Sequence, residues 1–192
     1  MEPSVNRIIT AIALLAFALS VASASAQTPA YKVLATSKTS TMQKEMQDAG
    51  QLGYRFVAVM GGETAIGGKE VVVLMEKDPA SKATYDYRLL ATTKTSTLQK
   101  EMQEVGDAGF GVVGQTVFES VFGGKETAAI VERGSADKVI RYEYRLVATS
   151  KTSTLERELQ EAAVDGFMAV DMTVGKTALG GSELVVITRR PK

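Results

Sequence analysis

The chain has no cysteine, no histidine and no tryptophan among its 192 residues. Without cysteine it can form neither a disulfide framework nor a thiolate nucleophile, and it offers no thiol for an iron–sulfur cluster or a lipid anchor. Without histidine it lacks the commonest general base and the commonest ligand of zinc and copper sites. Any acid–base chemistry would therefore depend on carboxylates, lysine or tyrosine. We expect no enzyme and no cofactor.

The sequence also has no excess of charge of either sign, because 22 Lys and Arg residues balance 22 Asp and Glu residues. Nucleic acids and anionic membranes select a surplus of basic side chains, which displaces the counterions of the phosphate groups. We therefore expect no nucleic-acid partner. Hydrophobic residues at 45% and charged residues at 23% are ordinary for a folded globular chain.

Residues 1–26 differ from the rest of the chain. Arg7 gives a short positive start, an apolar run follows over residues 8–21, and Ala24-Ser25-Ala26 supplies the small residues of a cleavage site. This pattern predicts a signal peptide cut before Gln27, and hence a periplasmic or secreted protein. The alternative is an uncleaved membrane anchor, although the apolar run is short for a span of about 20 residues. No membrane span is expected after signal removal.

The remainder of the chain contains one unit three times. The copies begin YKVLATSKTSTMQKEMQ at Tyr31, YRLLATTKTSTLQKEMQ at Tyr87 and YRLVATSKTSTLERELQ at Tyr144, so they are 56 and 57 residues apart. Matching at this density predicts tandem duplication. We assign the three repeats to residues 27–76, 85–133 and 142–190.

Each repeat is predicted to fold as β-α-β-β, which places the protein in the α+β class. In the second repeat, residues 85–93 alternate bulky and small or polar side chains, as a strand does. Leu98, Met102 and Val105 then follow at the spacing of a helix with one buried stripe. The runs GVVGQTVF and ETAAIVE predict two further strands, joined by a hairpin turn at Gly123-Gly124, which corresponds to Gly67-Gly68 and Gly180-Gly181 in the other repeats.

The expected ends of the helices recur as well. A serine stands three residues before Gln or Glu, which is the spacing of a capping box at a helix start. The pairs are Ser40/Gln43, Ser96/Gln99 and Ser153/Glu156. A glycine stands where a left-handed residue ends a helix, at Gly53, Gly109 and Gly166.

A unit of about 50 residues is near the lower limit for a self-sufficient core. No disulfide or evident metal site compensates for this. We therefore expect the three units to pack into one pseudo-symmetric or stacked body, with independent beads on linkers as the alternative. The sequence does not fix the oligomeric state.

The repeats resemble a bacterial family of small domains of unknown function. The family pattern is a Tyr-x-Tyr-Lys/Arg strand, a helix with spaced leucines, a Gly-x-x-Gly-aromatic turn and a closing hairpin. The matching stretches here are Tyr85-Asp86-Tyr87-Arg88, Gly106-Asp107-Ala108-Gly109-Phe110, Tyr142-Glu143-Tyr144-Arg145 and Gly50-Gln51-Leu52-Gly53-Tyr54. The chain departs from the pattern where the family commonly has Trp after the second Gly, and at Ala163 in place of the first Gly. The resemblance implies βαββ domains and brings no catalytic residues.

The repeated Lys-Thr-Ser-Thr segment is the main candidate site, because it places a cation and hydroxyl groups at a helix N-terminus, which attracts anions. The candidate anion-binding residues are Lys38, Ser40, Lys94, Ser96, Lys151 and Ser153. The residue types alone favour the alternative, in which the serines cap the helices and the lysines are solvated. No metal ligands are expected, because the Glu after each Gly pair falls far below the ligand density of a calcium loop.

The favoured function is a non-enzymatic binding or scaffold module, whose three similar surfaces bind an unknown protein or glycan of the cell envelope with avidity. One alternative is a carboxylate-dependent hydrolase acting on envelope glycans. Such an enzyme needs two carboxylates in unlike environments, whereas repeats make environments alike. The other alternative is a purely structural envelope protein.

Overall fold

The computed structural model describes residues 28–64, 68–119, 125–176 and 182–192. The predicted signal peptide and, except for Gly68, the predicted hairpin glycines lie outside these residues. The first repeat consists of β1 (Ala30–Thr36), α1 (Thr39–Gln51), β2 (Arg55–Thr64) and β3 (Gly68–Lys77). The second consists of β4 (Tyr85–Thr92), α2 (Thr95–Asp107), β5 (Gly111–Glu119) and β6 (Lys125–Gly134). The third consists of β7 (Tyr142–Thr149), α3 (Thr152–Val164), β8 (Met168–Lys176) and β9 (Ser182–Pro191).

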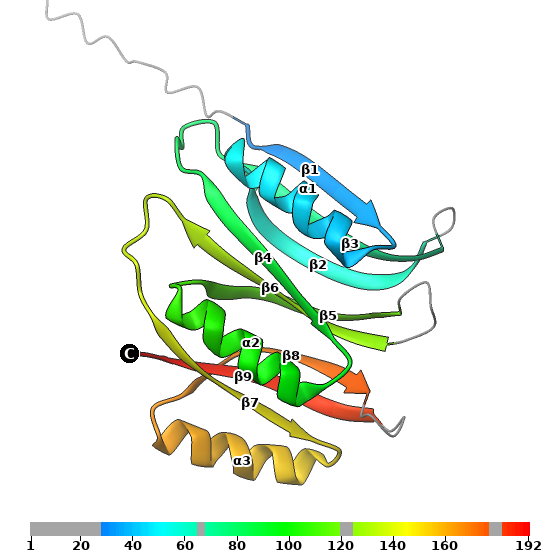
Figure 1. Ribbon diagram of the computed structural model, residues 1–192, viewed down its shortest axis with the longest axis vertical. Coiled ribbons are helices and arrows are strands. Elements are labelled where there is room, and N and C mark those ends of the chain that lie inside the picture. Colours follow the sequence, from blue (N-terminus) through cyan, green and yellow to red (C-terminus); the bar gives the residue numbers. More distant parts are fainter. Residues whose placement is uncertain (1–27, 65–67, 120–124, 177–181) are drawn as a thin grey trace, which may run out of the picture.

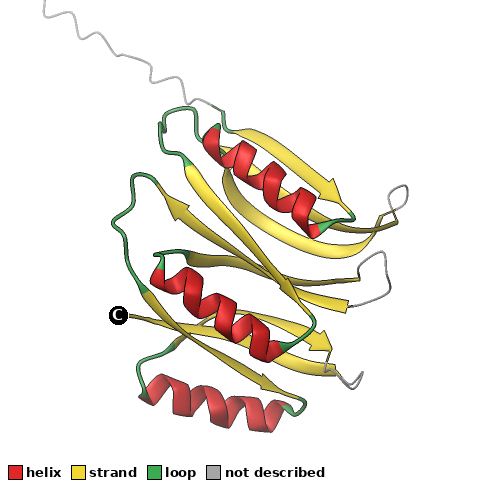
Figure 2. Cartoon of the chain, viewed as in Figure 1, coloured by secondary structure: helices red, strands yellow, loops and turns green. Residues whose placement is uncertain are grey.

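The predicted α+β class and the β-α-β-β order are confirmed in all three repeats (Figure 2). The strands form three antiparallel sheets with the orders β1-β3-β2, β4-β6-β5 and β7-β9-β8, which we call sheets 1, 2 and 3. The last strand of each repeat thus lies in the middle and pairs with both others. It is the most buried strand and is rich in valine and isoleucine in β3 and β9, as a central strand requires.

The glycines at the helix ends behave as predicted, because Gly53, Gly109 and Gly166 have φ values of 87°, 81° and 82°. The predicted capping boxes are wrong. The helices begin at Thr39, Thr95 and Thr152, so the serines lie within the first turn, and the capping positions are lysines that make no side-chain cap bond. The side chains of Gln43 and Gln99 form hydrogen bonds with the next repeat instead of with the helix start.

The three repeats are stacked along the long axis of the molecule, as Figure 1 shows. Along this axis β1, α1, β4, α2, β7 and α3 follow one another, so each of the first two helices lies between its own sheet and the first strand of the next repeat. One core cluster joins Met42 and Met46 of α1 to Tyr87, Leu89 and Ile130 of the second repeat. This shared core confirms the packed arrangement and excludes independent beads.

The second junction repeats this arrangement, since Leu98 and Met102 of α2 share a cluster with Tyr144 and Ile187 of the third repeat. The third helix has no following repeat, and the cluster beneath it is small. Among the described residues, no helix is both long enough and apolar enough to cross a bilayer.

Candidate functional site

The junctions between repeats are built around the free edge of a strand. Glutamines of α1 accept hydrogen bonds from the backbone of β4: Gln47 Oε1 from the Tyr87 N–H at 2.8 Å and Gln43 Oε1 from the Leu89 N–H at 3.1 Å. An edge strand has unpaired backbone groups. The glutamines of α1 therefore accept hydrogen bonds from the free edge of β4, as the carbonyl groups of a neighbouring strand would.

The same contact recurs at the second junction. Gln99 Oε1 accepts from the Leu146 N–H at 2.7 Å, and its Nε2 donates to the Tyr144 carbonyl at 2.8 Å. Gln103 Oε1 accepts from the Tyr144 N–H at 3.2 Å and its Nε2 donates to the Tyr142 carbonyl at 3.2 Å. At both junctions, a helix with two glutamines four residues apart thus forms hydrogen bonds with the first strand of the next repeat.

A glycine three residues after the second glutamine lets each helix approach the strand. A Cβ atom on Gly50 would lie 2.2 Å from the Tyr85 carbonyl oxygen, and one on Gly106 would lie 2.5 Å from the Tyr142 carbonyl oxygen. No real side chain tolerates such a distance to a backbone atom. The first glycine of the Gly-x-x-Gly pattern is therefore a requirement of the junction between repeats.

A buried tyrosine anchors the first junction. The Tyr87 hydroxyl donates to Glu132 Oε2 at 2.7 Å and accepts from the Phe56 N–H of the preceding repeat at 2.8 Å. Glu132, whose side chain is 4% exposed, also forms an ion pair with Arg55 at 3.0 Å. A buried carboxylate requires such partners. Burial raises the pKa of Tyr87, and Glu132 raises the pKa of Arg55.

At the second junction, a basic residue replaces the buried glutamate of the first junction. Arg189 stands where the second repeat has Glu132, and Gly111 stands where the first repeat has Arg55. The Tyr144 hydroxyl instead donates to the Phe110 carbonyl at 3.1 Å and accepts from the Val112 N–H at 3.0 Å. A Cβ on Gly111 would come within 3.0 Å of Arg189 Nη1, so this glycine leaves room for the arginine.

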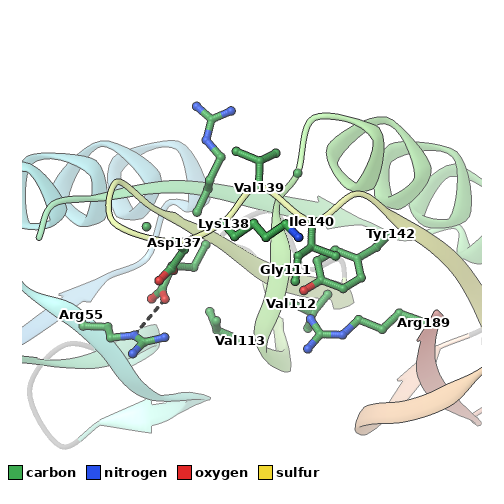
Figure 3. A pocket seen from close by; sticks show the side chains of 14 residues that line it. Arg55, Gly111, Val112, Val113, Asp137, Lys138, Val139, Ile140, Tyr142 and Arg189 are labelled. Carbon is green, nitrogen blue, oxygen red and sulfur yellow. Dashed lines mark hydrogen bonds and ion pairs between the residues drawn. The ribbon is translucent and has the colours of Figure 1, made fainter. Parts of the chain in front are cut away.

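A pocket of about 170 Å³ lies where these two junctions meet. Figure 3 shows Arg55 and Arg189 reaching toward it from opposite sides, with Lys138, Val139 and Ile140 of the segment between β6 and β7 along its rim. Glu132 and Asp137 also line it. Sites for small molecules occupy about 300–1,000 Å³, so this pocket is smaller than most. Two of its charged groups, Arg55 and Glu132, pair with each other across the first junction.

The six predicted anion-binding residues are all exposed. Figure 1 places the three helix starts along one side of the stack, in separate layers, so the structure does not bring them to a common axis. Beside the start of α2, the Thr95 hydroxyl donates to the Glu183 carboxylate at 2.6 Å, and a protein carboxylate thus lies near this helix start. Anion binding there stays a prediction.

One large apolar surface was not predicted from the sequence. It is the face of sheet 1 that points away from the second repeat, and we call it the open face. It consists of Tyr31, Val33, Ala35, Ala58, Met60, Val72 and Leu74, with Glu76 opposite Tyr31 at one end. Tyr31 is 61% exposed, whereas the equivalent Tyr87 and Tyr144 are 3% and 2% exposed. Val33 is 65% exposed, whereas the equivalent Leu89 is 9% exposed.

The described part of the chain contains no group of three or more Asp or Glu residues placed to hold a metal ion. Comparison of the chain with family models, with curated proteins and with solved structures finds no match.

Proposed function

We propose that this protein is an exported, non-enzymatic binding module that docks onto another protein of the cell envelope through the open face. The observation that carries the proposal is the contrast between equivalent positions. Tyr31 and Val33 are exposed on the first repeat, whereas the equivalent tyrosines and Leu89 of the later repeats are buried under a helix and Leu146 is half-buried. A contiguous apolar patch on a folded surface marks an interaction site.

Export rests on the signal-peptide pattern of residues 1–26, and a cysteine-free chain folds in the envelope without oxidative assistance. Membership of the family of small βαββ domains of unknown function, which the repeats resemble, is part of the same proposal. A protein partner is favoured over a glycan, because the open face is aliphatic apart from Tyr31 and Glu76. A sugar site needs polar groups that fix the orientation of its ligand.

The alternative of a carboxylate-dependent glycan hydrolase has one observation in its favour, since Glu132 and Asp137 line one pocket in unlike surroundings. However, one oxygen of Glu132 pairs with Arg55 and the other accepts from Tyr87. A substrate would have to displace these partners to reach the carboxylate. A binding module therefore accounts better for the structure than a hydrolase does. A purely structural envelope role would not explain why apolar side chains are exposed on the open face.

Photo-crosslinking in cells tests the proposal. A photoreactive amino acid in place of Val33 should give one discrete adduct with another protein. The matched control places the same amino acid at Val164, which is 87% exposed at the opposite end of the stack. A binding module predicts an adduct at Val33 that is absent at Val164. If position 33 gave no adduct, or the same products as position 164, the open face would not be a binding site.

A further inference from the structure

The molecule itself shows what fits a surface like the open face. The equivalent face of sheet 2 is covered by α1, and that of sheet 3 by α2. The two covering helices share three features: a buried apolar pair, two glutamines four residues apart and a glycine three residues after the second glutamine. These residues are Met42, Met46, Gln43, Gln47 and Gly50 in α1, and Leu98, Met102, Gln99, Gln103 and Gly106 in α2.

Strand β1 offers the same acceptor surface for such a helix. Tyr31 pairs with Glu76 in sheet 1 as Tyr87 pairs with Glu132 in sheet 2, so the two first strands have the same register. The N–H groups of Tyr31 and Val33 therefore point to the free edge, as those of Tyr87 and Leu89 do. An apolar face beside an unpaired strand edge is the combination that α1 and α2 cover in the later repeats.

A second copy of the chain does not supply the missing helix. Among the described residues, the one helix not covered by a following repeat is α3, which carries Ala163 where the other helices have glycine. In the equivalent position the Cβ of Ala163 would meet the carbonyl of Pro29, as the 2.2 Å and 2.5 Å distances at Gly50 and Gly106 indicate. Glu156 replaces the first glutamine, and a carboxylate has no N–H to donate as Gln99 does to the Tyr144 carbonyl.

We propose that the open face and the free edge of β1 bind an amphipathic helix of a partner protein. This helix has the pattern Gln-x-x-x-Gln-x-x-Gly, with an apolar residue directly before each glutamine. The helix lies across sheet 1 as α1 lies across sheet 2. Its glutamines accept from the N–H groups of Val33 and Tyr31, and its glycine passes over the carbonyl of Pro29. This inference rests on the proposed binding function and specifies the partner's chemistry.

The test uses the full protein and a peptide of residues 94–110, which contains α2. Lys100 and Glu104 lie four residues apart on the exposed side of α2, so a lactam bridge between them holds the peptide helical without touching the docking side. The matched control is the same bridged peptide with Gln99→Glu and Gly106→Ala, which gives it the features of α3. Binding is measured by fluorescence anisotropy.

The bridged peptide is expected to bind at least tenfold more tightly than the control peptide. Val33→Lys and Met60→Lys in the protein should each weaken binding at least tenfold, while Val164→Lys at the other end of the stack should leave it unchanged. Val33 and Met60 are 65% and 58% exposed, so both variants are expected to fold. Equal binding of the two peptides, absence of binding, or indifference to Val33→Lys would overturn the proposal.

Sedimentation velocity of the unmodified protein gives a second test. The proposal predicts a monomer at concentrations where the bridged peptide binds. Self-association that Val33→Lys abolishes would show that a second copy occupies the open face, and would overturn the choice of partner. If the peptide fails to bind while the crosslinker at Val33 still captures a protein, the helix pattern is wrong and the binding function stands. If neither experiment succeeds, both proposals are wrong.

Discussion

Replacing Gly50 by alanine should destabilise the protein, although alanine is the better helix former. In the interior of a helix, alanine is favoured over glycine by about 1 kcal/mol. Against this gain, the new Cβ would lie 2.2 Å from the Tyr85 carbonyl oxygen and 2.9 Å from Tyr87 Cε2. Overpacking of this kind costs about 1–3 kcal/mol. Movement of α1 away from β4 would also weaken the two bonds from Gln43 and Gln47, each contributing about 1 kcal/mol.

The net loss in the free energy of unfolding is therefore expected to be about 1–3 kcal/mol, which corresponds to a fall in Tm of several degrees for a chain of this size. Urea unfolding followed by circular dichroism measures it. Asp48→Ala is the matched control, because Asp48 is exposed on the same helix and its replacement gains helix propensity without a clash. If Gly50→Ala were as stable as Asp48→Ala, the close approach of α1 to β4 would not exist in solution.

Three other variants probe separate parts of the stack. Tyr87→Phe removes the buried hydroxyl between the Phe56 N–H and Glu132 and should cost about 1–3 kcal/mol, whereas Tyr31→Phe on the exposed equivalent should change stability by less than about 0.5 kcal/mol in urea unfolding. Gln115→Met should raise Tm and stabilise by about 1–3 kcal/mol, because none of the described residues bonds the buried amide and the third repeat carries Met172 there; an unchanged or lower Tm would contradict this. Asp86→Asn tests the pH dependence: the hydrogen bond from Arg133, and then that from Gln47, lower the pKa of Asp86, so its stabilisation is present above about pH 4 and is lost as the pH falls through the folded value. The variant should be less stable than the parent at pH 7 and approach it as the pH falls below about 4, and a constant difference between the two would disprove this role.

Much of the fold was predictable because the same sequence pattern occurs three times. The helical stripe at Leu98, Met102 and Val105 and the left-handed glycine at Gly109 are local patterns, and the structure confirms both. The order of the strands in each sheet was not predicted. In each sheet the last strand of the repeat lies between the first two, and no local sequence pattern specifies this order.

The junctions between repeats were missed because their residues had a plausible local explanation. Ser96 and Gln99 have the spacing of a capping box, yet Gln99 bonds the edge of β7 in the next repeat. Only a long-range contact distinguishes the two uses. The departure at Ala163 was visible in the sequence, but its meaning requires the distance between Gly106 and the Tyr142 carbonyl.

The open face could not be predicted from residue types at all. Tyr31 and Tyr87 are the same residue in the same motif, and they differ in exposure because one begins the stack and the other lies inside it. The first repeat thus exposes apolar side chains at positions that periodicity marks as core. The same comparison between repeats is what reveals the surface once the structure is known.

Amide hydrogen exchange at equivalent positions is the most direct test that the first strand is an unfilled copy of an internal docking site. In the free protein, the N–H groups of Tyr31 and Val33 should exchange orders of magnitude faster than those of Tyr87 and Leu89, which Gln47 and Gln43 hold. Addition of the bridged peptide of residues 94–110 should slow Tyr31 and Val33 specifically. Equal protection of all four amides in the free protein, or no slowing at Tyr31 and Val33 with the peptide, would contradict the account.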